Sequence, residues 1–469
     1  MGVKVASSIG RSAVRTLREA FQGRITMPED SGYDSARRVW NGSIDRHPAI
    51  IVTPAHTADV QAAVRFGRES DLLVAVRSGG HSVAGHSTCD GGLVIDLSGM
   101  KGIRVNPAGR RVHVQSGVLW GELDPETAAL GLAVTGGLVS STGVAGFTLG
   151  GGLGWLQRKH GLACDNLVSA EVVTAEGQIV TASNEANPEL LWGLRGGGGN
   201  FGIVTSFEFQ VHPVDEAVLS GARFYPAERA PEILGFFREY QAEGPEELTL
   251  GAVLRLAPPA PFLPESVHGR PVVALAGMYA GTKAEGVLRA LDSLGPPIAD
   301  LFVPRPYPQM QTLLDKGTEP GAQNYWKAEY LSGLPDEAIT SLLEHLASIT
   351  SPTSDIKLMQ LGGKVAAVGE DDSAYAHRSA PLIVNINARW GDARDSGRHV
   401  AWTRSLWDAM QPWSAGGSYT NFMSEDEAGR VSGSYGSLKY ERLAGLKRQY
   451  DPTNFFRLNH NVNPTGDPE

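Results

Sequence analysis

Glycine is concentrated in three short segments, and this distribution is the strongest constraint on how the chain can fold. Residues 143–154 contain six glycines in twelve positions, and 57 of the 469 residues are glycine, against an average share of about 7%. Such a segment makes a poor helix interior, because each glycine costs about 1 kcal/mol relative to alanine. Dense glycine is expected where backbone lies against a bound molecule, with an irregular buried loop as the alternative.

The second glycine segment, at residues 77–82, directly follows a strand-like run. Gly79 and Gly80 allow successive backbone N–H groups to converge on one point, which makes a nest for an anion such as a diphosphate. A plain strand turn is the alternative. His81 taken alone would be an ordinary hydrogen-bonded histidine, and its position directly after the nest makes it a candidate functional residue.

The third segment contains a G-x-G-x-x-G pattern at Gly197, Gly199 and Gly202. A dinucleotide-binding turn of that kind follows a strand and opens a helix. Here the predicted order is reversed, with a helix at 188–195 and a strand at 202–211, so we reject the Rossmann interpretation. Motifs of P-loop nucleotidases and of zinc proteases are absent from the sequence.

Apolar periodicity predicts an α+β fold in two units. In the first unit, the pattern predicts strands at 72–77, 93–98, 111–116 and 202–211, a hairpin at 168–181, and helices at 12–22, 57–70 with Thr57 as the cap, 118–130 and 188–195. Glycine density falls after Pro213. In the second unit, the pattern predicts strands at 272–279, 355–361 and 381–390, and helices at 283–294, 335–349, 396–410 and 437–449.

Charge and cysteine content narrow the function classes. The net charge of −10 argues against a nucleic-acid partner, which favours a basic surface. No apolar run is long enough to cross a membrane, and the N-terminus lacks the apolar stretch of a secretory signal. Cys89 and Cys164 could form at most one disulfide, and no zinc-site pattern is present. We expect a soluble, cytoplasmic protein.

Taken together, these segments resemble the berberine-bridge-enzyme-like branch of the FAD-linked oxidases, which share the vanillyl-alcohol oxidase fold. The matching stretches are RSGGHS at 77–82, the glycine segment with RKHGLACDN at 158–166, RGGGGNFGIVTSFEF at 195–209 and YDPTNFFRLNHNVNP at 450–464. The resemblance is closest to bacterial members that oxidise nicotine-type amines or modify secondary metabolites. It implies a PCMH-type FAD-binding domain formed by residues 1–212 and 431–469, and a substrate domain at 213–430 with an antiparallel sheet covered by helices.

The resemblance also implies which residues hold FAD, with His81 as the covalent attachment point. Many relatives add a second link through a cysteine, whose place is taken here by Val139, so a single link is expected. The implied cofactor residues are Arg77, Ser78, Gly79, Gly80 and Ser82 at the diphosphate, Val139, Thr142, Gly143, Gly146, Gly152 and Val204 along the cofactor, and Asn459 and Asn461 near the isoalloxazine.

The implied activity is oxidation of a small organic alcohol or amine, with hydride passing to the flavin N5 and electrons to dioxygen to give hydrogen peroxide. A dehydrogenase with another electron acceptor and a non-catalytic flavin-binding protein are the alternatives. We expect a small-molecule substrate and dioxygen as partners, without nucleic acid or membrane. The candidate catalytic residues are Lys357, Tyr325, Tyr419, Asn421 and, controlling access of dioxygen, Thr142.

Lys357 is the most specific of these candidates. Strand alternation places it on one face with Met359 and Leu361, both apolar. Burial among apolar groups lowers the pKa of a lysine, which could then act as a base or stabilise a tyrosine phenolate. The alternative is that its ammonium reaches solvent while its stem is buried.

Overall fold

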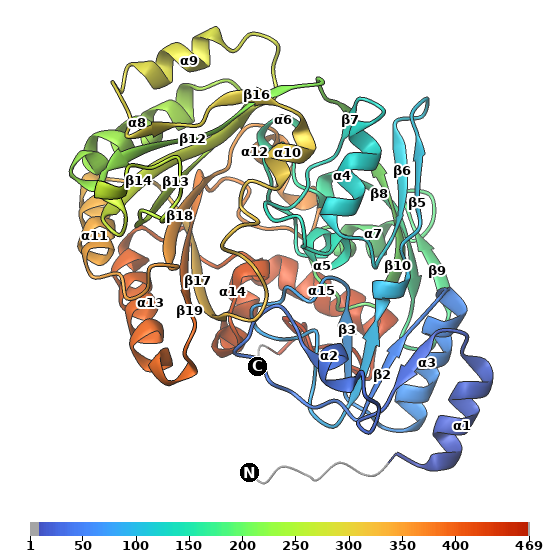
Figure 1. Ribbon diagram of the computed structural model, residues 1–469. Coiled ribbons are helices and arrows are strands. Elements are labelled where there is room, and N and C mark those ends of the chain that lie inside the picture. Colours follow the sequence, from blue (N-terminus) through green and yellow to red (C-terminus); the bar gives the residue numbers. More distant parts are fainter. Residues whose placement is uncertain (1–8, 468–469) are drawn as a thin grey trace.

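The computed structural model describes residues 9–467, which form two regions built on separate sheets (Figure 1). The first region holds a four-stranded and a five-stranded sheet, and the second region holds an eight-stranded sheet. This arrangement confirms the predicted α+β class with an antiparallel sheet in the second region. The predicted domain boundaries, 1–212 with 431–469 and 213–430, stay a prediction, and residues 1–8 lie outside the described part.

The four-stranded sheet combines parallel and antiparallel pairs. Its order is β1-β2-β4-β3, from β1 (Arg24–Thr26), β2 (Ile50–Thr53), β3 (Val74–Arg77) and β4 (Leu93–Asp96). Parallel strands need a crossover, and α3 (Thr57–Glu69) connects β2 to β3 while α1 (Arg11–Ala20) packs on α3.

The predicted cap of α3 at Thr57 is wrong. The His56 side chain accepts the Asp59 N–H at 3.3 Å, and the Thr57 hydroxyl donates to Glu171 instead.

The five-stranded antiparallel sheet supports the glycine segments. Its strands are β5 (Ile103–Asn106), β6 (Arg111–Gln115), β8 (Leu167–Val173), β9 (Ile179–Ala182) and β10 (Ile203–Gln210). They share one apolar core with α4 (Trp120–Ala128), α5 (Val144–Leu149), α7 (Pro188–Leu194) and α15 (Ser437–Tyr450). The prediction that residues 143–154 would not form a helix is half wrong. The first half of this segment forms α5, with Gly146 inside the helix. The second half is irregular, with φ of +124° at Gly151 and +94° at Gly152.

The eight-stranded sheet has one covered face and one face turned toward the first region (Figure 1). Its strands are β12 (Val218–Pro226), β13 (Leu248–Leu256), β14 (Pro271–Tyr279), β15 (Ala299–Asp300), β16 (Val303–Arg305), β17 (Gln323–Leu331), β18 (Asp355–Gln360) and β19 (Leu382–Trp390). The covering helices are α8 (Ala230–Glu243), α9 (Glu285–Asp292), α11 (Asp336–Ala347) and α13 (Ser396–Met410). The apolar pattern of the sequence does not predict β12, β13, β17 or α8.

Two further expectations concern cysteines and membranes. Cys89 and Cys164 are both buried free thiols in different apolar clusters, so the conceivable disulfide does not form. Within residues 9–467, every helix falls short of the length or apolar character that crossing a bilayer requires.

A buried ion pair fixes the tail, residues 450–464, against the first region. The side chains of Lys447 and Asp451 are both fully buried, with 2.7 Å between Nζ and Oδ2. The Lys447 ammonium also donates to the carbonyls of Asn200 and Phe456, at 2.8 and 2.9 Å. Asp451 accepts the N–H groups of Phe455 and Phe456. One pair therefore joins α15, the third glycine segment and the tail.

Removing the charge of Lys447 should destabilise this junction. Lys447→Met keeps the length of the side chain and leaves the Asp451 carboxylate buried without its cation, which should cost about 3–5 kcal/mol of unfolding free energy. Urea denaturation measures the change. Lys283→Met, at an exposed site in the second region, should change stability by no more than about 0.5 kcal/mol. Equal losses in the two variants would contradict the proposed importance of the pair.

Candidate active site

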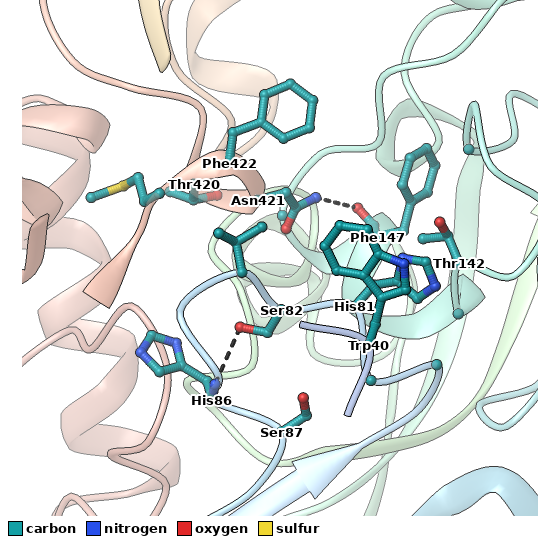
Figure 2. Close-up of a pocket in the computed structure, with 18 of the residues that line it drawn as sticks. Trp40, His81, Ser82, His86, Ser87, Thr142, Phe147, Thr420, Asn421 and Phe422 are labelled. Carbon is teal, nitrogen blue, oxygen red and sulfur yellow. Dashed lines mark hydrogen bonds between the residues drawn. The ribbon is translucent and has the colours of Figure 1, made fainter. Parts of the chain in front are cut away.

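A cavity of about 420 Å³ lies where the two regions meet, within the usual size range for cofactor and substrate sites. From the first region it is lined by the turn at 78–82, parts of the segments 137–153 and 198–204, and residues of the tail. From the second region it is lined by side chains of β13, β17, β18 and β19, and by the loop around residues 314–318. Figure 2 shows the two walls meeting, with Asn421 donating to the Phe147 carbonyl at 3.0 Å.

Bare backbone brings two of the glycine segments together on the cavity wall. A Cβ atom added to Gly79 would lie 2.3 Å from the Gly143 nitrogen, and one added to Gly143 would lie 2.3 Å from the Gly79 nitrogen. Gly146 and Gly199 differ, because an added Cβ would meet no atom within 4 Å. These two glycines line the cavity and leave open the space that a flat or extended cofactor needs. The residues present therefore fit FAD.

His81 lies at the junction of these segments. Its Nε2 is 2.9 Å from the Ser141 hydroxyl, and its ring stacks on Trp40 with 5.1 Å between centroids (Figure 2). Burial lowers the pKa of His81 to about 4. The imidazole is therefore neutral at pH 7 and keeps a ring nitrogen with a free electron pair.

Most of the expected cofactor residues line the cavity, and three do not. Those that line it are Ser78, Gly79, Gly80, His81, Ser82, Val139, Thr142, Gly143, Gly146, Val204 and Asn459. The Arg77 guanidinium instead pairs with Asp96 at 2.8 Å, so this side chain supports the turn from behind. Gly152 lies beside the cavity, and Asn461 lines a smaller neighbouring pocket.

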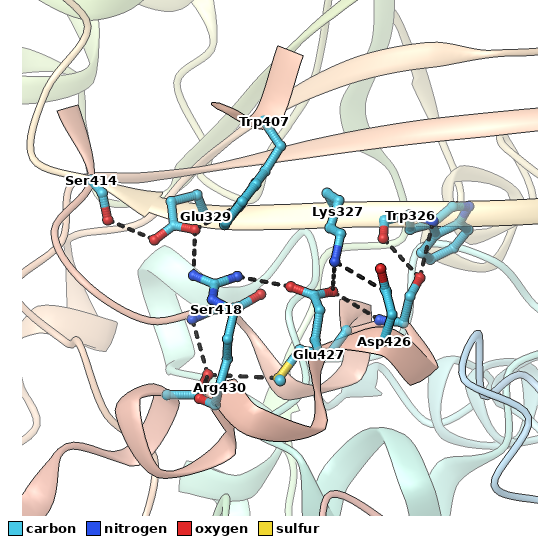
Figure 3. A network of polar contacts seen from close by, with 12 residues as sticks. Trp326, Lys327, Glu329, Trp407, Ser414, Ser418, Asp426, Glu427 and Arg430 are labelled. Atoms are coloured by element: carbon cyan, nitrogen blue, oxygen red, sulfur yellow. Dashed lines mark hydrogen bonds and ion pairs between the residues drawn. The ribbon is translucent and has the colours of Figure 1, made fainter. Parts of the chain in front are cut away.

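Tyr325 lies on the wrong side of its strand for catalysis. Alternation along β17 turns Trp326 to the cavity, while Tyr325 and Lys327 project from the opposite face. The Tyr325 hydroxyl donates to Asp426 at 2.7 Å. Lys327 pairs with Asp426 at 3.1 Å and with Glu427 at 3.4 Å (Figure 3). The prediction that Tyr325 is catalytic is therefore wrong, and this network instead attaches residues 426–430 to the sheet.

Tyr419 and Asn421 lie together on the cavity wall, as expected. The Tyr419 hydroxyl accepts hydrogen bonds from the Gly152 N–H and from Asn421 Nδ2, each at 2.8 Å. Burial raises the pKa of Tyr419, so the phenol is neutral at pH 7. A hydroxyl that accepts two hydrogen bonds still has its own proton to donate.

Lys357 also lines the cavity, in surroundings that are less apolar than predicted. Met359 lies on the same face, whereas Leu361 lies beyond the end of β18 and packs into an apolar cluster. Asp355 lies on that face as well, and its carboxylate pairs with the Lys357 ammonium. Asn385 stands opposite Lys357 on β19. The lysine is therefore paired within the cavity and does not reach out alone into solvent.

Several residues of the cavity wall are not predicted from the sequence. They are Trp40, Arg255, Asn324, Asn385, Asn387 and Arg389. For the last three a signal was present: in the strand predicted at 381–390, polar residues at every second position alternate with Ile386 and Ala388, the pattern of a strand with one polar face.

The chain matches two family profiles and is similar to several known proteins. A family profile described as an FAD binding domain matches residues 48–183, and one described as "Berberine and berberine like" matches residues 418–463. An FAD-linked oxidoreductase of Dictyostelium discoideum is 32% identical to the chain over 95% of this chain and 96% of its own length. (R)-6-hydroxynicotine oxidase of Paenarthrobacter nicotinovorans is also 32% identical, over 95% of this chain and 98% of its own.

A solved structure agrees with these matches. The crystal structure of 6-hydroxy-D-nicotine oxidase from Arthrobacter nicotinovorans superimposes with a TM-score of 0.85 at 29% identity, covering 95% of this chain and 98% of the other. Chitooligosaccharide oxidase has the same fold, with a TM-score of 0.84 at 23% identity. The relatives match along nearly the whole chain, and the two family profiles cover the FAD-binding segment and the segment that carries Tyr419, Asn421 and the tail. The chain therefore belongs to the berberine-bridge-enzyme-like family of FAD-linked oxidoreductases.

Proposed function

We propose that the protein is an FAD-linked oxidase that removes hydride from a small organic alcohol or amine and gives hydrogen peroxide from dioxygen. When bound, FAD supplies the hydride acceptor at N5 and the route for electrons to dioxygen. The observation that carries the proposal is that one cavity joins glycine-lined backbone on one wall to ionisable side chains on the other. The oxidase named among the relatives supports the choice of acceptor.

On the cofactor side, we propose that His81 binds FAD covalently and alone. A neutral imidazole is the form that can bond to carbon, and burial keeps His81 neutral. Val139, which lines the cavity, has no sulfur with which to form a second link. The backbone of the turn at 78–82 would hold the diphosphate. Thr142 is a small residue on the same wall, and we propose that it leaves room for dioxygen.

On the substrate side, we propose that Lys357, Tyr419 and Asn421 position the substrate and move its proton. An alcohol must lose its hydroxyl proton as hydride leaves, so a base or a hydrogen-bond relay is needed, whereas a neutral amine needs no base. Asn421 fixes the Tyr419 hydroxyl at 2.8 Å. The Lys357–Asp355 pair provides a second proton-binding group on the cavity wall.

The acceptor can be tested by separating the two half-reactions. Anaerobic mixing with a panel of alcohols and amines should bleach the oxidised flavin band for at least one of them, and air should then restore it with one peroxide per flavin. Slow recovery in air with fast recovery by an artificial acceptor would indicate a dehydrogenase. A flavin that no compound reduces would favour a binding protein without catalysis.

His81→Ala should abolish covalent attachment. Flavin should leave this variant on acid precipitation, while the parent protein and His47→Ala, an exposed histidine, should keep a yellow pellet. Mass spectrometry of the digested parent should show one flavin-bearing peptide, which contains His81. A parent that releases all its flavin, or a flavin that joins two peptides, would contradict the proposal.

Lys357→Met should slow anaerobic flavin reduction by about a hundredfold or more, the usual scale of general acid–base assistance. Methionine keeps the length of the side chain and removes its proton-binding group. Reoxidation by air, measured by stopped flow, should hardly change. Lys364→Met, an exposed lysine just beyond β18, serves as the control. A reduction rate within a few-fold of the parent would make Lys357 a structural residue.

A further inference from the structure

The substrate wall of the cavity carries more positive than negative charge. Four cationic side chains line the cavity, from Arg255, Lys316, Lys357 and Arg389, against the single carboxylate of Asp355 among the lining residues in the described chain. Lys357 and Asp355 compensate each other as a pair. The two arginines and the exposed Lys316 form no ion pair within residues 9–467, so this wall keeps a net positive charge.

Arg389 is held in place by contacts that include no ion pair within the described residues. Its Nη2 donates to the Glu319 carbonyl at 2.6 Å, and its guanidinium lies 5.7 Å from the centroid of the Trp40 ring. Its Nη1 is buried and has no hydrogen-bond partner within residues 9–467. A buried cationic donor without a partner costs free energy. An anionic group of a ligand would remove that cost.

Two buried amides continue this polar surface. Asn385 and Asn387 are 2% and 6% exposed, and both line the cavity. Asn387 donates to Asp355 at 2.9 Å, while its Oδ1 and the Nδ2 of Asn385 have no partner in the described chain. One free acceptor and one free donor two residues apart are the complement of hydroxyl groups, which both donate and accept.

The order of the cavity-facing side chains along β18 and β19 indicates how a substrate would be oriented in the cavity. Met359 and Tyr419 share an apolar cluster at one end. Lys357 with Asn385, and then Asp355 with Asn387, form successive cross-strand pairs, and Arg389 follows two residues later on β19. At about 3.4 Å per residue, Arg389 lies roughly 7 Å beyond Asn387 and roughly 14 Å beyond Asn385.

We propose that the substrate is an anion, an alcohol that also bears a carboxylate. The carboxylate pairs with Arg389 and Arg255, hydroxyl groups bind Asn385 and Asn387, and the carbon to be oxidised lies toward Lys357 and Tyr419. Oxidation of the bound alcohol rests on the proposed oxidase function, whereas binding of the alcohol does not. The planar guanidinium groups suit a carboxylate through paired N–H donors.

The test compares each acid with its neutral ester. The probes are D-glucuronate and 4-(hydroxymethyl)benzoate, each titrated beside its methyl ester into the flavin-loaded protein under anaerobic conditions. Perturbation of the flavin spectrum reports binding, and bleaching reports reduction. At least one acid should bind about tenfold or more tightly than its ester, a difference of about 1.4 kcal/mol. This preference should shrink as salt screens the charges.

Arg389→Gln should abolish the preference for the acid. Arg394→Gln removes the same charge from a side chain that is 90% exposed just past the end of β19, and it should keep the preference. Flavin content and circular dichroism check that Arg389→Gln is folded, and Arg255→Gln gives a second variant that should weaken acid binding. Arg389→Lys, which restores the charge, should recover part of the preference.

The outcomes separate this inference from the proposed function. Esters that bind as tightly as their acids, or acids that leave the flavin spectrum unchanged at millimolar concentration, would overturn the anionic substrate even if neutral alcohols reduce the flavin. Acids that bind in an Arg389-dependent way without bleaching the flavin would support the anionic site and count against the redox function.

Discussion

The contact between the backbones of Gly79 and Gly143 is the constraint on which the rest of the site depends. A Cβ atom added at either position would lie only 2.3 Å from the main-chain nitrogen of the other glycine, so neither position can carry a side chain. The close approach sets the distance between the turn at 78–82 and the segment that carries Val139 to Gly146. It thereby places His81 within hydrogen-bonding distance of Ser141.

The second wall of the cavity follows from strand alternation across the eight-stranded sheet. Every second residue of β18 and β19 packs against α8, α11 and α13 in an apolar core, so the intervening residues must face the cavity. The apolar core therefore fixes the positions of Asp355, Lys357, Asn385 and Asn387. Polar groups that would be costly in a closed interior are retained on this face, where a ligand can satisfy them.

The sequence predicts those features of the fold and the site that depend on residues close together in the chain. The glycine segments, the helix-before-strand order around Gly199 and the position of Lys357 on β18 all follow from local spacing. Tyr325 was misplaced because β17 was not recognised, and without a strand the opposite directions of Tyr325 and Trp326 are unknown. The role of Arg77 depends on Asp96, nineteen residues away on a neighbouring strand, and local spacing does not reveal such a partner. In the sequence, Lys447 looks like an ordinary lysine on a helix surface, although its side chain is fully buried in a pair with Asp451.

The tail has a consequence for how the protein is made. Phe456, Leu458, Asn459 and His460 complete a cavity wall to which Trp40 and residues between 74 and 204 also contribute. The Lys447–Asp451 pair holds the tail there. Domains generally fold from the N-terminal side during synthesis. The two small sheets of the first region cannot complete their cores in this order, because residues of α15 and Phe455 and Phe456 of the tail belong to those cores. The apolar cores and the site for FAD are therefore completed together, once residues 450–464 have left the ribosome.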